Sequence, residues 1–517
     1  MSRRHCLSSP RLVSNRTRRD RAIDLLETLE SRISLSASPV GADVGGASEI
    51  YRIAAWSNGQ AGSQYGQAYN NPQFAQAQTF FNLFRHRFQP YVNPNPNPNP
   101  NPNPNPDPTP TPPAPGTPAT ITQLVEGNLT RLVITGTSGD DNISVTESGT
   151  TFTITSNGNT NSVTGNFGEL AIYGGDGNDT ITVQSSVNIT SLLYGGAGVN
   201  TLTALGTAKS YIVTLGGGTD TLTGNGTNTS FWADPTDVVH ATSAENSAGD
   251  VHVVSGFYQP FSSSPSNPKY IPTTLNGPTL PEPTDAGTTV HVTASLWGTG
   301  PVMTDVNQGQ VGDCYFLATV QSLAFAQPSK LEEMAVDLGD GTYAVQFKRG
   351  GTTSYVRVDA DFPAASWGGL YYAHPTSGGS IWAEVMEKAY AYFRTGANTY
   401  ASLNSGWTGS VFGDLGVPTN TFNTGGSGLF SELATAVNAG KAVAAITVSS
   451  MPSGIPIIGS HAYSVVATSV VSGVQYVTVR NPWGFDGAGS DSNTSDGLVT
   501  ITMAQFNQAF TAGSIQV

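Results

Sequence analysis

The stretch NQGQVGDCYFLATVQSLA, residues 307–324, decides the fold of the C-terminal part of the chain. A turn of Gly and Asp leads directly into an apolar run long enough for a buried helix, and Asp313 is placed to cap its first turn. Cys314 then lies where backbone N–H groups and the helix dipole favour a negative charge. Because the thiolate is the reactive form of cysteine, this position predicts a nucleophile. The side-chain amide of Gln308 is placed to donate to an oxyanion.

The chain of 517 residues contains two cysteines, Cys6 and Cys314. We expect Cys6, in an arginine-rich leader, to be removed or to lack a fixed structure, so that no disulfide framework forms. A lone cysteine is either a small buried hydrophobic residue or a reactive thiol. The glycine turn and the apolar run around Cys314 favour the reactive thiol.

Two further motifs supply the partners that a nucleophilic cysteine requires. In GSHAYSVV, residues 459–466, a turn of small residues places His461 at the start of an apolar strand. In VTVRNPWG, residues 477–484, a β-branched strand ends at Asn481. A Cys–His pair needs a third polar group to fix the imidazole tautomer, and asparagine serves in papain-like enzymes. Trp483 is placed to shield this histidine–asparagine bond from water.

Together these motifs resemble the calpain family of papain-like cysteine proteases. The family patterns Q-G-x-x-G-D-C with a following aromatic residue, G-x-H-A-Y-S-V and R-N-P-W-G occur here in that order. Two shorter elements, at residues 356–363 and 382–391, also resemble the family. The resemblance covers about residues 301–517 and implies an α+β fold, in which a helical half and a β-rich half face each other across a cleft.

The resemblance also implies a role for each residue of the site. The nucleophile, the base that later acts as acid, the residue that orients the imidazole, and an oxyanion donor are, in this order, Cys314, His461, Asn481 and Gln308. Trp483 and Gly312 are implied to shield and line the substrate site. The implied reaction is hydrolysis of peptide bonds in protein or peptide substrates through an acyl-enzyme.

Calpain cores can bind Ca²⁺ to align their two halves, so calcium dependence is a further expectation, without assigned ligands. Two other interpretations stay open. The first is a non-enzymatic, calcium-binding surface or adhesion protein with a degenerate protease module, against which the intact set of site residues weighs. The second is a papain-fold acyltransferase such as a transglutaminase-like enzyme, a class that usually has aspartate where this chain has Asn481.

Residues 119–230 contain four turn-like units, of which the last three begin about 20 residues apart. The units are residues 136–144, 174–182, 195–203 and 216–223. Glycine permits the positive φ of a tight turn, and alternating Thr, Ile and Val between the units predict strands with one buried face. A period near 20 residues predicts the stacked coils of a β-solenoid.

The units resemble the nonapeptide G-G-x-G-x-D-x-(apolar)-x of the haemolysin-type calcium-binding (RTX) family. The unit at Gly174 matches every specified position, whereas Asn200 replaces the aspartate in the next unit. In that family, aspartates and turn carbonyls bind Ca²⁺, a hard cation that prefers oxygen ligands. The alternative is that these turns are only turns. The candidate ligands are Asp141, Asp176, Asp179 and Asp220.

Seven Asn-Pro repeats open a proline-rich segment at residues 93–118. Proline at every second position excludes a helix or a central strand and predicts a semi-rigid spacer. Further upstream, LESRISLSA at residues 29–37 resembles the LEPR-XLL segment near the start of large planctomycete surface and secreted proteins. This resemblance implies a secreted or cell-surface protein; the alternative is a short amphipathic helix without targeting value.

The net charge of −14 is spread unevenly. The first 38 residues hold eight Arg and four acidic residues, which leaves 14 basic and 32 acidic residues, or −18, in the rest. An acidic body argues against nucleic-acid binding and suits a secreted protein that meets Ca²⁺. No run of 18 apolar residues occurs, so we expect no transmembrane span.

We therefore expect a multidomain chain. Its predicted parts are a low-order N-terminal region with an export segment (1–92), the proline-rich linker (93–118), an RTX-like β-solenoid (119–230), a connecting region (231–290) and a calpain-like catalytic domain (291–517).

Overall fold

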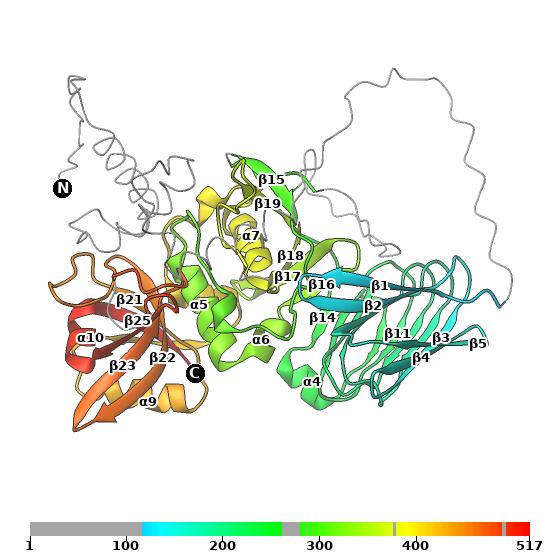
Figure 1. Ribbon diagram of the computed structural model, residues 1–517, viewed down its shortest axis with the longest axis horizontal. Helices are drawn as coiled ribbons and strands as arrows, with labels where there is room; N and C mark the ends of the chain where they lie inside the picture. The colour runs from blue at the N-terminus through cyan, green and yellow to red at the C-terminus, as the bar shows by residue number, and fades with distance from the viewer. Residues whose placement is uncertain (1–115, 261–279, 286, 376–378, 489–492) are drawn as a thin grey trace, which may run out of the picture.

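The structure is a computed structural model that describes residues 116–260, 280–285, 287–375, 379–488 and 493–517 (Figure 1). The segment that resembles an export signal and most of the proline-rich linker lie outside the described residues. The described chain forms a β-solenoid, at the right of Figure 1, and an α+β part at its centre and left.

The solenoid consists of two sheets that face each other. The first sheet has the order β1 (Thr120–Glu126), β2 (Leu129–Thr135), β6 (Glu169–Tyr173), β8 (Thr190–Tyr194), β10 (Ser210–Thr214), β12 (Thr229–Ala233) and β14 (Val251–Val253). The second has the order β13 (Val238–His240), β11 (Thr221–Thr223), β9 (Thr201–Ala204), β7 (Thr180–Val183), β3 (Asn142–Ser148), β4 (Thr151–Ser156) and β5 (Asn159–Thr164). Successive coils pair in parallel within each sheet, which confirms the predicted β-solenoid.

Side-chain alternation explains how the two sheets pack. In β7, β9 and β11, Ile181, Leu202 and Leu222 are buried between the sheets, and the threonines beside them face outward. Strands β6, β10 and β12 of the other sheet are instead buried on both faces. One face contributes Ile172 and Ile212 to the solenoid core, so the opposite face must pack on another part of the chain.

The aspartates of the repeat units have partners inside the solenoid. Oδ1 of Asp179 accepts the backbone N–H of Asp141 at 2.8 Å, and Oδ1 of Asn200 accepts that of Asp179 at 2.9 Å. Oδ1 of Asp220 accepts the N–H of Asn200 at 2.6 Å. Each side chain therefore satisfies the backbone of the preceding coil, and asparagine serves as well as aspartate because both offer an acceptor oxygen.

This ladder gives Asp179 and Asp220 a structural role, and the Asp141 side chain accepts the backbone N–H of Thr137 at 2.6 Å. The fourth predicted calcium ligand, Asp176, is exposed and forms an isolated β-bridge with Ala197. Among the described residues, no group of three or more His, Cys, Asp or Glu side chains is arranged to hold a metal ion. Calcium binding at Asp141, Asp176, Asp179 and Asp220 stays a prediction.

The solenoid continues past its predicted end at residue 230. Strands β13 and β14 extend the two sheets, and α4 (Ser243–Ala248) lies between them, opened by a capping box of Thr242 and Glu245. The predicted connecting region 231–290 thus begins with a further coil. The repeat pattern does not predict this coil, because Asp234 and Pro235 stand where the earlier coils have a glycine turn.

The helical half of the α+β part carries the predicted nucleophile. Its helices are η2 (Met303–Asp305), α5 (Cys314–Ala326), α6 (Pro328–Glu332), α7 (Trp382–Thr395), η3 (Tyr400–Leu403) and α8 (Thr408–Asp414). The same half contains an antiparallel sheet of three strands, β16 (Ala335–Asp337), β17 (Thr342–Arg349) and β18 (Thr352–Asp359). It also contains the antiparallel pair β15 (Thr288–His291) and β19 (Asp361–Ala364). The domain therefore begins at β15, slightly before its predicted start at residue 291.

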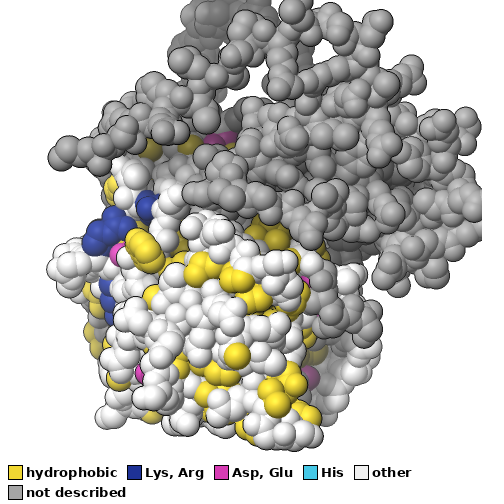
Figure 2. All heavy atoms as spheres, turned by 90° about the vertical axis from the view of Figure 1, so that its left-hand side faces the viewer, with side chains coloured by type: hydrophobic (Ala, Val, Ile, Leu, Met, Phe, Trp, Pro, Cys, Tyr) yellow, Lys and Arg dark blue, Asp and Glu magenta, His cyan; other side chains and the backbone are white. Residues whose placement is uncertain are grey.

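The β-rich half forms an antiparallel sheet covered by two helices. The strand order is β20 (Thr419–Asn423), β25 (Phe510–Gln516), β21 (Val443–Thr447), β22 (Ala462–Val471), β23 (Val474–Arg480) and β24 (Leu498–Thr502). The helices are α9 (Leu429–Asn438) and α10 (Met503–Ala509). Figure 2 views the molecule from this side, where charged side chains are sparse among uncharged ones.

The doubly buried sheet of the solenoid packs against the helical half. The rings of Tyr173 and Tyr194 stack at 4.6 Å, and Trp232 stacks on His252 at 4.1 Å. The Trp232 ring also meets Tyr355 of β18 edge-on at 5.6 Å. Tyr173, Tyr194 and Trp232 belong to the same hydrophobic cluster as α5, and Tyr355 packs against it, so the two parts share one core.

A buried charge cluster reinforces this contact. Nη2 of Arg131, in β2, lies 2.8 Å from Glu169, 3.1 Å from Glu126 and 3.2 Å from Asp337 at the end of β16. The Tyr194 hydroxyl also donates to the Asp337 carbonyl at 3.3 Å. Arg131 thus links the solenoid to the sheet of the helical half.

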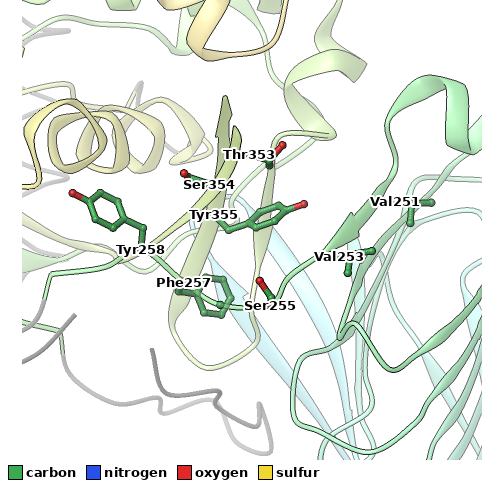
Figure 3. Close-up of a pocket in the computed structure, with 9 residues that line it drawn as sticks. Val251, Val253, Ser255, Phe257, Tyr258, Thr353, Ser354 and Tyr355 are labelled. Carbon is green, nitrogen blue, oxygen red and sulfur yellow. The ribbon is translucent and has the colours of Figure 1, made fainter. Parts of the chain in front are cut away.

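A pocket of about 550 Å³ lies where β14 approaches β18 (Figure 3). Its lining includes Val253, Phe257 and Tyr355 and none of the predicted site residues. Within the described ranges, no helix is long and apolar enough to cross a membrane.

Candidate active site

Cys314 is the first residue of α5 and is 3% exposed. The Asp313 carbonyl accepts the N–H groups of Phe316 and Leu317 at 2.7 and 3.1 Å, so the helix begins where the sequence predicts. The prediction that the Asp313 side chain caps the helix is wrong, because this side chain makes no capping hydrogen bond. It faces Glu387 of α7 instead. The helix dipole still favours a thiolate at Cys314.

The loop before Cys314 is fixed to two neighbouring segments. The Gln310 N–H donates to the Tyr371 carbonyl at 2.6 Å, and the Gly312 N–H donates to Oδ1 of Asn404 at 3.1 Å. These bonds join the loop to two separate segments of the chain, so its backbone is held in one conformation before the substrate binds.

Gln308 is buried in the same loop. Its backbone N–H donates to the Pro482 carbonyl at 2.8 Å and so ties the loop to the β-rich half. Its side-chain Nε2 donates to the Val311 carbonyl at 2.7 Å. The Gln308 side chain also hydrogen-bonds to the Asp313 carboxyl group. Its role as an oxyanion donor stays a prediction.

His461 and Asn481 form a hydrogen bond across neighbouring strands. Nε2 of His461 lies 2.8 Å from Oδ1 of Asn481. Because an amide oxygen only accepts, we assign the proton to Nε2, which leaves Nδ1 as the basic nitrogen. His461 directly precedes β22 and Asn481 directly follows β23, and the antiparallel pairing of these strands brings the two residues together. Nδ2 of Asn481 also donates to the Asp486 carbonyl at 3.2 Å.

The ring of Trp483 lies beside this bond. Its centroid is 4.7 Å from that of His461, and its backbone N–H donates to Oδ1 of Asn481 at 3.1 Å. Burial lowers the pKa of His461 to about 4, although the bond to Asn481 acts in the opposite direction. The imidazole is therefore neutral at pH 7, as a general base must be.

The helix of Cys314 packs on the strand of His461. The Ser464 hydroxyl, in β22, donates to the Ala318 carbonyl of α5 at 2.9 Å. Cys314 lies one turn before Ala318, and His461 lies three residues before Ser464, which places both toward the same end of this contact. Burial raises the pKa of Tyr463, and the nearby Cys314 adds to this rise. The Tyr463 ring lies 5.1 Å from that of His461.

Arg480 is a residue of the site that the motifs left without a role. It directly precedes Asn481 and is buried. Its Nη1 donates to the carbonyls of Met303, at 2.7 Å, and Val306, at 3.3 Å. The strand that ends at Asn481 is thus bonded directly to the segment that leads into the Cys314 loop.

A buried carboxyl group on α7 was also missed. Neither oxygen of Glu384 has a hydrogen-bond partner in the part of the chain that the structure describes. Burial raises its pKa to about 8, and the neighbouring Asp305 acts in the same direction. Asp305 itself accepts the indole N–H of Trp382 at 2.7 Å. The available signal was WAEVMEKAYA, in which two glutamates interrupt an apolar helical run.

The site combines a cysteine at the start of a buried helix with a neutral histidine that is hydrogen-bonded to an asparagine. The helix of the cysteine packs on the strand that follows the histidine. This is the arrangement of papain-like cysteine proteases. Residues 288–505 match the family model described as calpain family cysteine protease. The chain therefore carries a calpain-family cysteine protease domain, and this part of the predicted resemblance is confirmed.

Curated relatives show the same similarity. Calpain-type cysteine protease DEK1 of Zea mays is 29% identical over 217 residues, which are 37% of this chain and 9% of that protein. The calpain-2 catalytic subunit of Gallus gallus is 29% identical over 207 residues, which are 36% of this chain and 28% of that protein. That of Homo sapiens is 28% identical over 211 residues, with the same shares of both chains. The chain thus spans less than a third of the length of each relative.

Proposed function

We propose that the protein is a cysteine endopeptidase that cleaves protein substrates with Cys314, His461 and Asn481. The hydrogen bond between His461 and Asn481 carries the proposal, because it fixes the tautomer whose Nδ1 can remove a thiol proton. The start of α5 supplies a thiol where negative charge is favoured.

The reaction follows from these positions. Nδ1 of His461 takes the thiol proton, and the sulfur of Cys314 attacks the carbonyl carbon of the peptide bond. The backbone N–H of Cys314 and the side-chain amide of Gln308 hold the oxyanion. The imidazolium then gives its proton to the amine, which departs. The acyl group stays bound to the sulfur of Cys314 as a thioester. Water, activated by the same imidazole, hydrolyses this acyl-enzyme and restores the thiol.

The test is casein hydrolysis by the full-length protein. The full chain is needed because the solenoid and the helical half share a core. We expect peptides from the wild type and none from Cys314→Ala, and we expect Asn481→Ala to lose roughly 10² or more in rate, as when acid–base geometry is disturbed. Ser431→Ala, at an exposed position of α9, is the control.

Other products would point to the other interpretations. If casein became crosslinked and the crosslinking required Cys314, the protein would be an acyltransferase and not a protease. A folded wild type that neither cleaves nor crosslinks any substrate would overturn the catalytic proposal in favour of a binding protein.

We infer further that the protease domain binds Ca²⁺ through Glu384 and Asp305. The unpartnered oxygens of Glu384 support this, because buried carboxylates that lack donors suit a hard cation. When bound, the ion supplies a positive charge that favours the ionised form of the Glu384 carboxyl group. Chain segments beside Asp305 accept hydrogen bonds from Arg480, so the ion would also favour the joined arrangement of the two halves.

Thermal unfolding separates this site from the solenoid. We expect Ca²⁺ to raise the Tm of the wild type above its value in chelator, and we expect Glu384→Gln to remove this rise. If the rise in Tm with Ca²⁺ were lost in Asp179→Asn but kept in Glu384→Gln, the ion would bind in the solenoid. An unchanged wild-type Tm at millimolar Ca²⁺ would overturn both calcium proposals.

We propose that the protein acts outside the cell, secreted or associated with the cell surface. The leader segment at residues 29–37 supports this through its resemblance to surface and secreted proteins. Deletion of this segment is expected to retain the protein inside the producing cells, as immunoblots of cell and medium fractions would show. Unchanged export after the deletion would contradict the proposal.

A further inference from the structure

Two carboxyl groups meet behind the predicted nucleophile. Asp313 is 0% exposed and Glu387, on α7, is 1% exposed. Both oxygens of Glu387 accept the backbone N–H of Ala373, at 3.0 and 3.2 Å. The side chains of Asp313 and Glu387 lie in hydrogen-bonding contact with each other, and the Gln308 side chain also hydrogen-bonds to the Asp313 carboxyl group.

Chemistry requires a proton in this contact. Two ionised carboxylates offer only acceptors, so they can form a hydrogen bond only when one of them is protonated. Two like charges at such a separation in a buried site also cannot both persist. Burial raises the pKa of Glu387, and the adjacent Asp313 raises it further. Burial likewise raises the pKa of Asp313.

We propose that Asp313 and Glu387 share one proton and that this hydrogen-bonded pair positions the loop that carries Gln308 and Cys314. The inference deepens the proposed protease function and rests on it for its effect on rate. Both are positioning residues, because Asp313 acts through Cys314 and Glu387 acts through Asp313.

The connections of the pair explain why it matters for the loop. Asp313 directly precedes Cys314, so the pair holds the loop at its end. Glu387 is anchored to Ala373, two residues after Tyr371, whose carbonyl receives the N–H of Gln310. The loop, the segment at residues 371–373 and α7 are therefore joined in a closed ring of hydrogen bonds. Opening this ring frees the backbone that presents the thiol.

The surroundings cannot compensate for the loss of the shared proton. The other titratable groups that face the pair are Glu384 on α7, Tyr400 on η3, Tyr372, Tyr315 and Cys314. None of these groups carries a positive charge in any protonation state, and the pH profiles are recorded in chelator so that no Ca²⁺ at Glu384 supplies one. Alkaline pH therefore brings two carboxylates into contact and pushes the loop away from α7.

Glu387→Gln is the decisive variant because glutamine keeps the shape of the contact. Its amide oxygen can accept the Ala373 N–H, and its N–H can donate to an ionised Asp313, but it has no proton to lose. We expect the kcat/KM of the wild type to fall about tenfold per pH unit on the alkaline side, and we expect Glu387→Gln to lose this decline. Glu387→Ala is expected to lower kcat/KM about 10²-fold at neutral pH through misplacement of the loop.

The matched control is Glu432→Gln, the same change at an exposed position of α9. This control is expected to retain the wild-type pH profile. An alkaline decline that persists unchanged in Glu387→Gln would overturn the proposal.

Infrared difference spectroscopy tests the pair without any enzymatic activity. We expect the wild type to show a carboxylic-acid C=O band that Glu387→Gln lacks, that Glu432→Gln retains, and that disappears at alkaline pH. If no such band distinguishes Glu387→Gln from the wild type, the shared proton is refuted whatever the activity. If the band is present in a protein that cleaves no substrate, the pair stands and the proposed protease function fails.

Discussion

Replacing Arg131 by methionine should destabilise the solenoid and the protease domain together. Methionine keeps much of the length of the side chain but removes the charge that faces three buried carboxyl groups, those of Glu126, Glu169 and Asp337. Removing one partner from a buried ion pair costs about 3–5 kcal/mol, because the other charge stays buried without compensation.

The resulting change in Tm depends on how much of the chain unfolds as one unit. The unfolding entropy is about 2.1 cal/mol/K per residue, so a unit of about 375 described residues loses about 4–6 °C for this cost. A solenoid of about 140 residues that unfolded separately would lose about 10–17 °C. Because the two parts share a hydrophobic cluster, we expect one transition and the smaller shift.

The stability that is lost in Arg131→Met should also depend on pH. Burial already raises the pKa of Glu126 to about 7, although Arg131 acts in the opposite direction. Without Arg131, the folded-state pKa of Glu126 rises further above its unfolded value. The folded variant then binds more protons than the unfolded chain, so its stability falls as pH rises, and the loss should be larger at pH 8 than at pH 5.

Differential scanning calorimetry of the full chain checks both points. The control is Arg349→Met, because Arg349 is half exposed in its pair with Asp414, and such pairs contribute about 0–1 kcal/mol. A shift of Arg131→Met below about 1 °C at pH 8 would refute the argument from buried charge. Two calorimetric transitions, of which only one changes its Tm in Arg131→Met, would refute the claim that the solenoid and the protease domain unfold as one unit.

Three further predictions follow from close contacts and buried groups. Gly309→Ala would bring a methyl group within 2.3 Å of backbone carbonyl oxygens, so kcat/KM for a peptide should fall about 10²-fold while circular dichroism stays unchanged. Gly196→Ala would require φ of +81° and place Cβ 2.0 Å from the Gly175 oxygen, so urea unfolding should show a loss of roughly 1–3 kcal/mol. Burial lowers the pKa values of His252 and His461 to about 3 and about 4, below their ordinary 6.5. The unfolded chain therefore binds more protons, and stability should fall as pH drops from about 6.5 to about 4, less steeply in His252→Gln.

Local rules explain why the arrangement of the candidate site could be predicted from sequence. The turn into an apolar run marks the start of α5, and the motifs of His461 and Asn481 lie at ends of consecutive strands that pair with each other. These signals need only neighbouring residues. The Asp313 side chain shows where such signals fail, because its local pattern predicts a cap and its contact with Glu387, 74 residues later, prevails.

The solenoid shows the same limit at larger scale. A period of about 20 residues was sufficient to predict stacked coils, since each coil repeats one local pattern. The final coil lacked that pattern and was missed. The interface was missed for a different reason: the aromatic residues Tyr173, Tyr194 and Trp232 stand in one column of the sheet, but nothing in a repeat shows what covers the column.

The covered column changes how the solenoid relates to the candidate active site. A solenoid that only displayed the protease on a spacer would have a solvated outer face, yet strands β6, β10 and β12 are buried on both faces. The partners of this face include the sheet of β16, β17 and β18, which supports α7. Helix α7 carries Glu384 and Glu387, and Glu387 contacts Asp313 beside Cys314. A series of packed elements therefore connects the solenoid to the loop of Cys314. The solenoid is therefore better understood as part of the framework that positions the predicted nucleophile than as an independent module beside it.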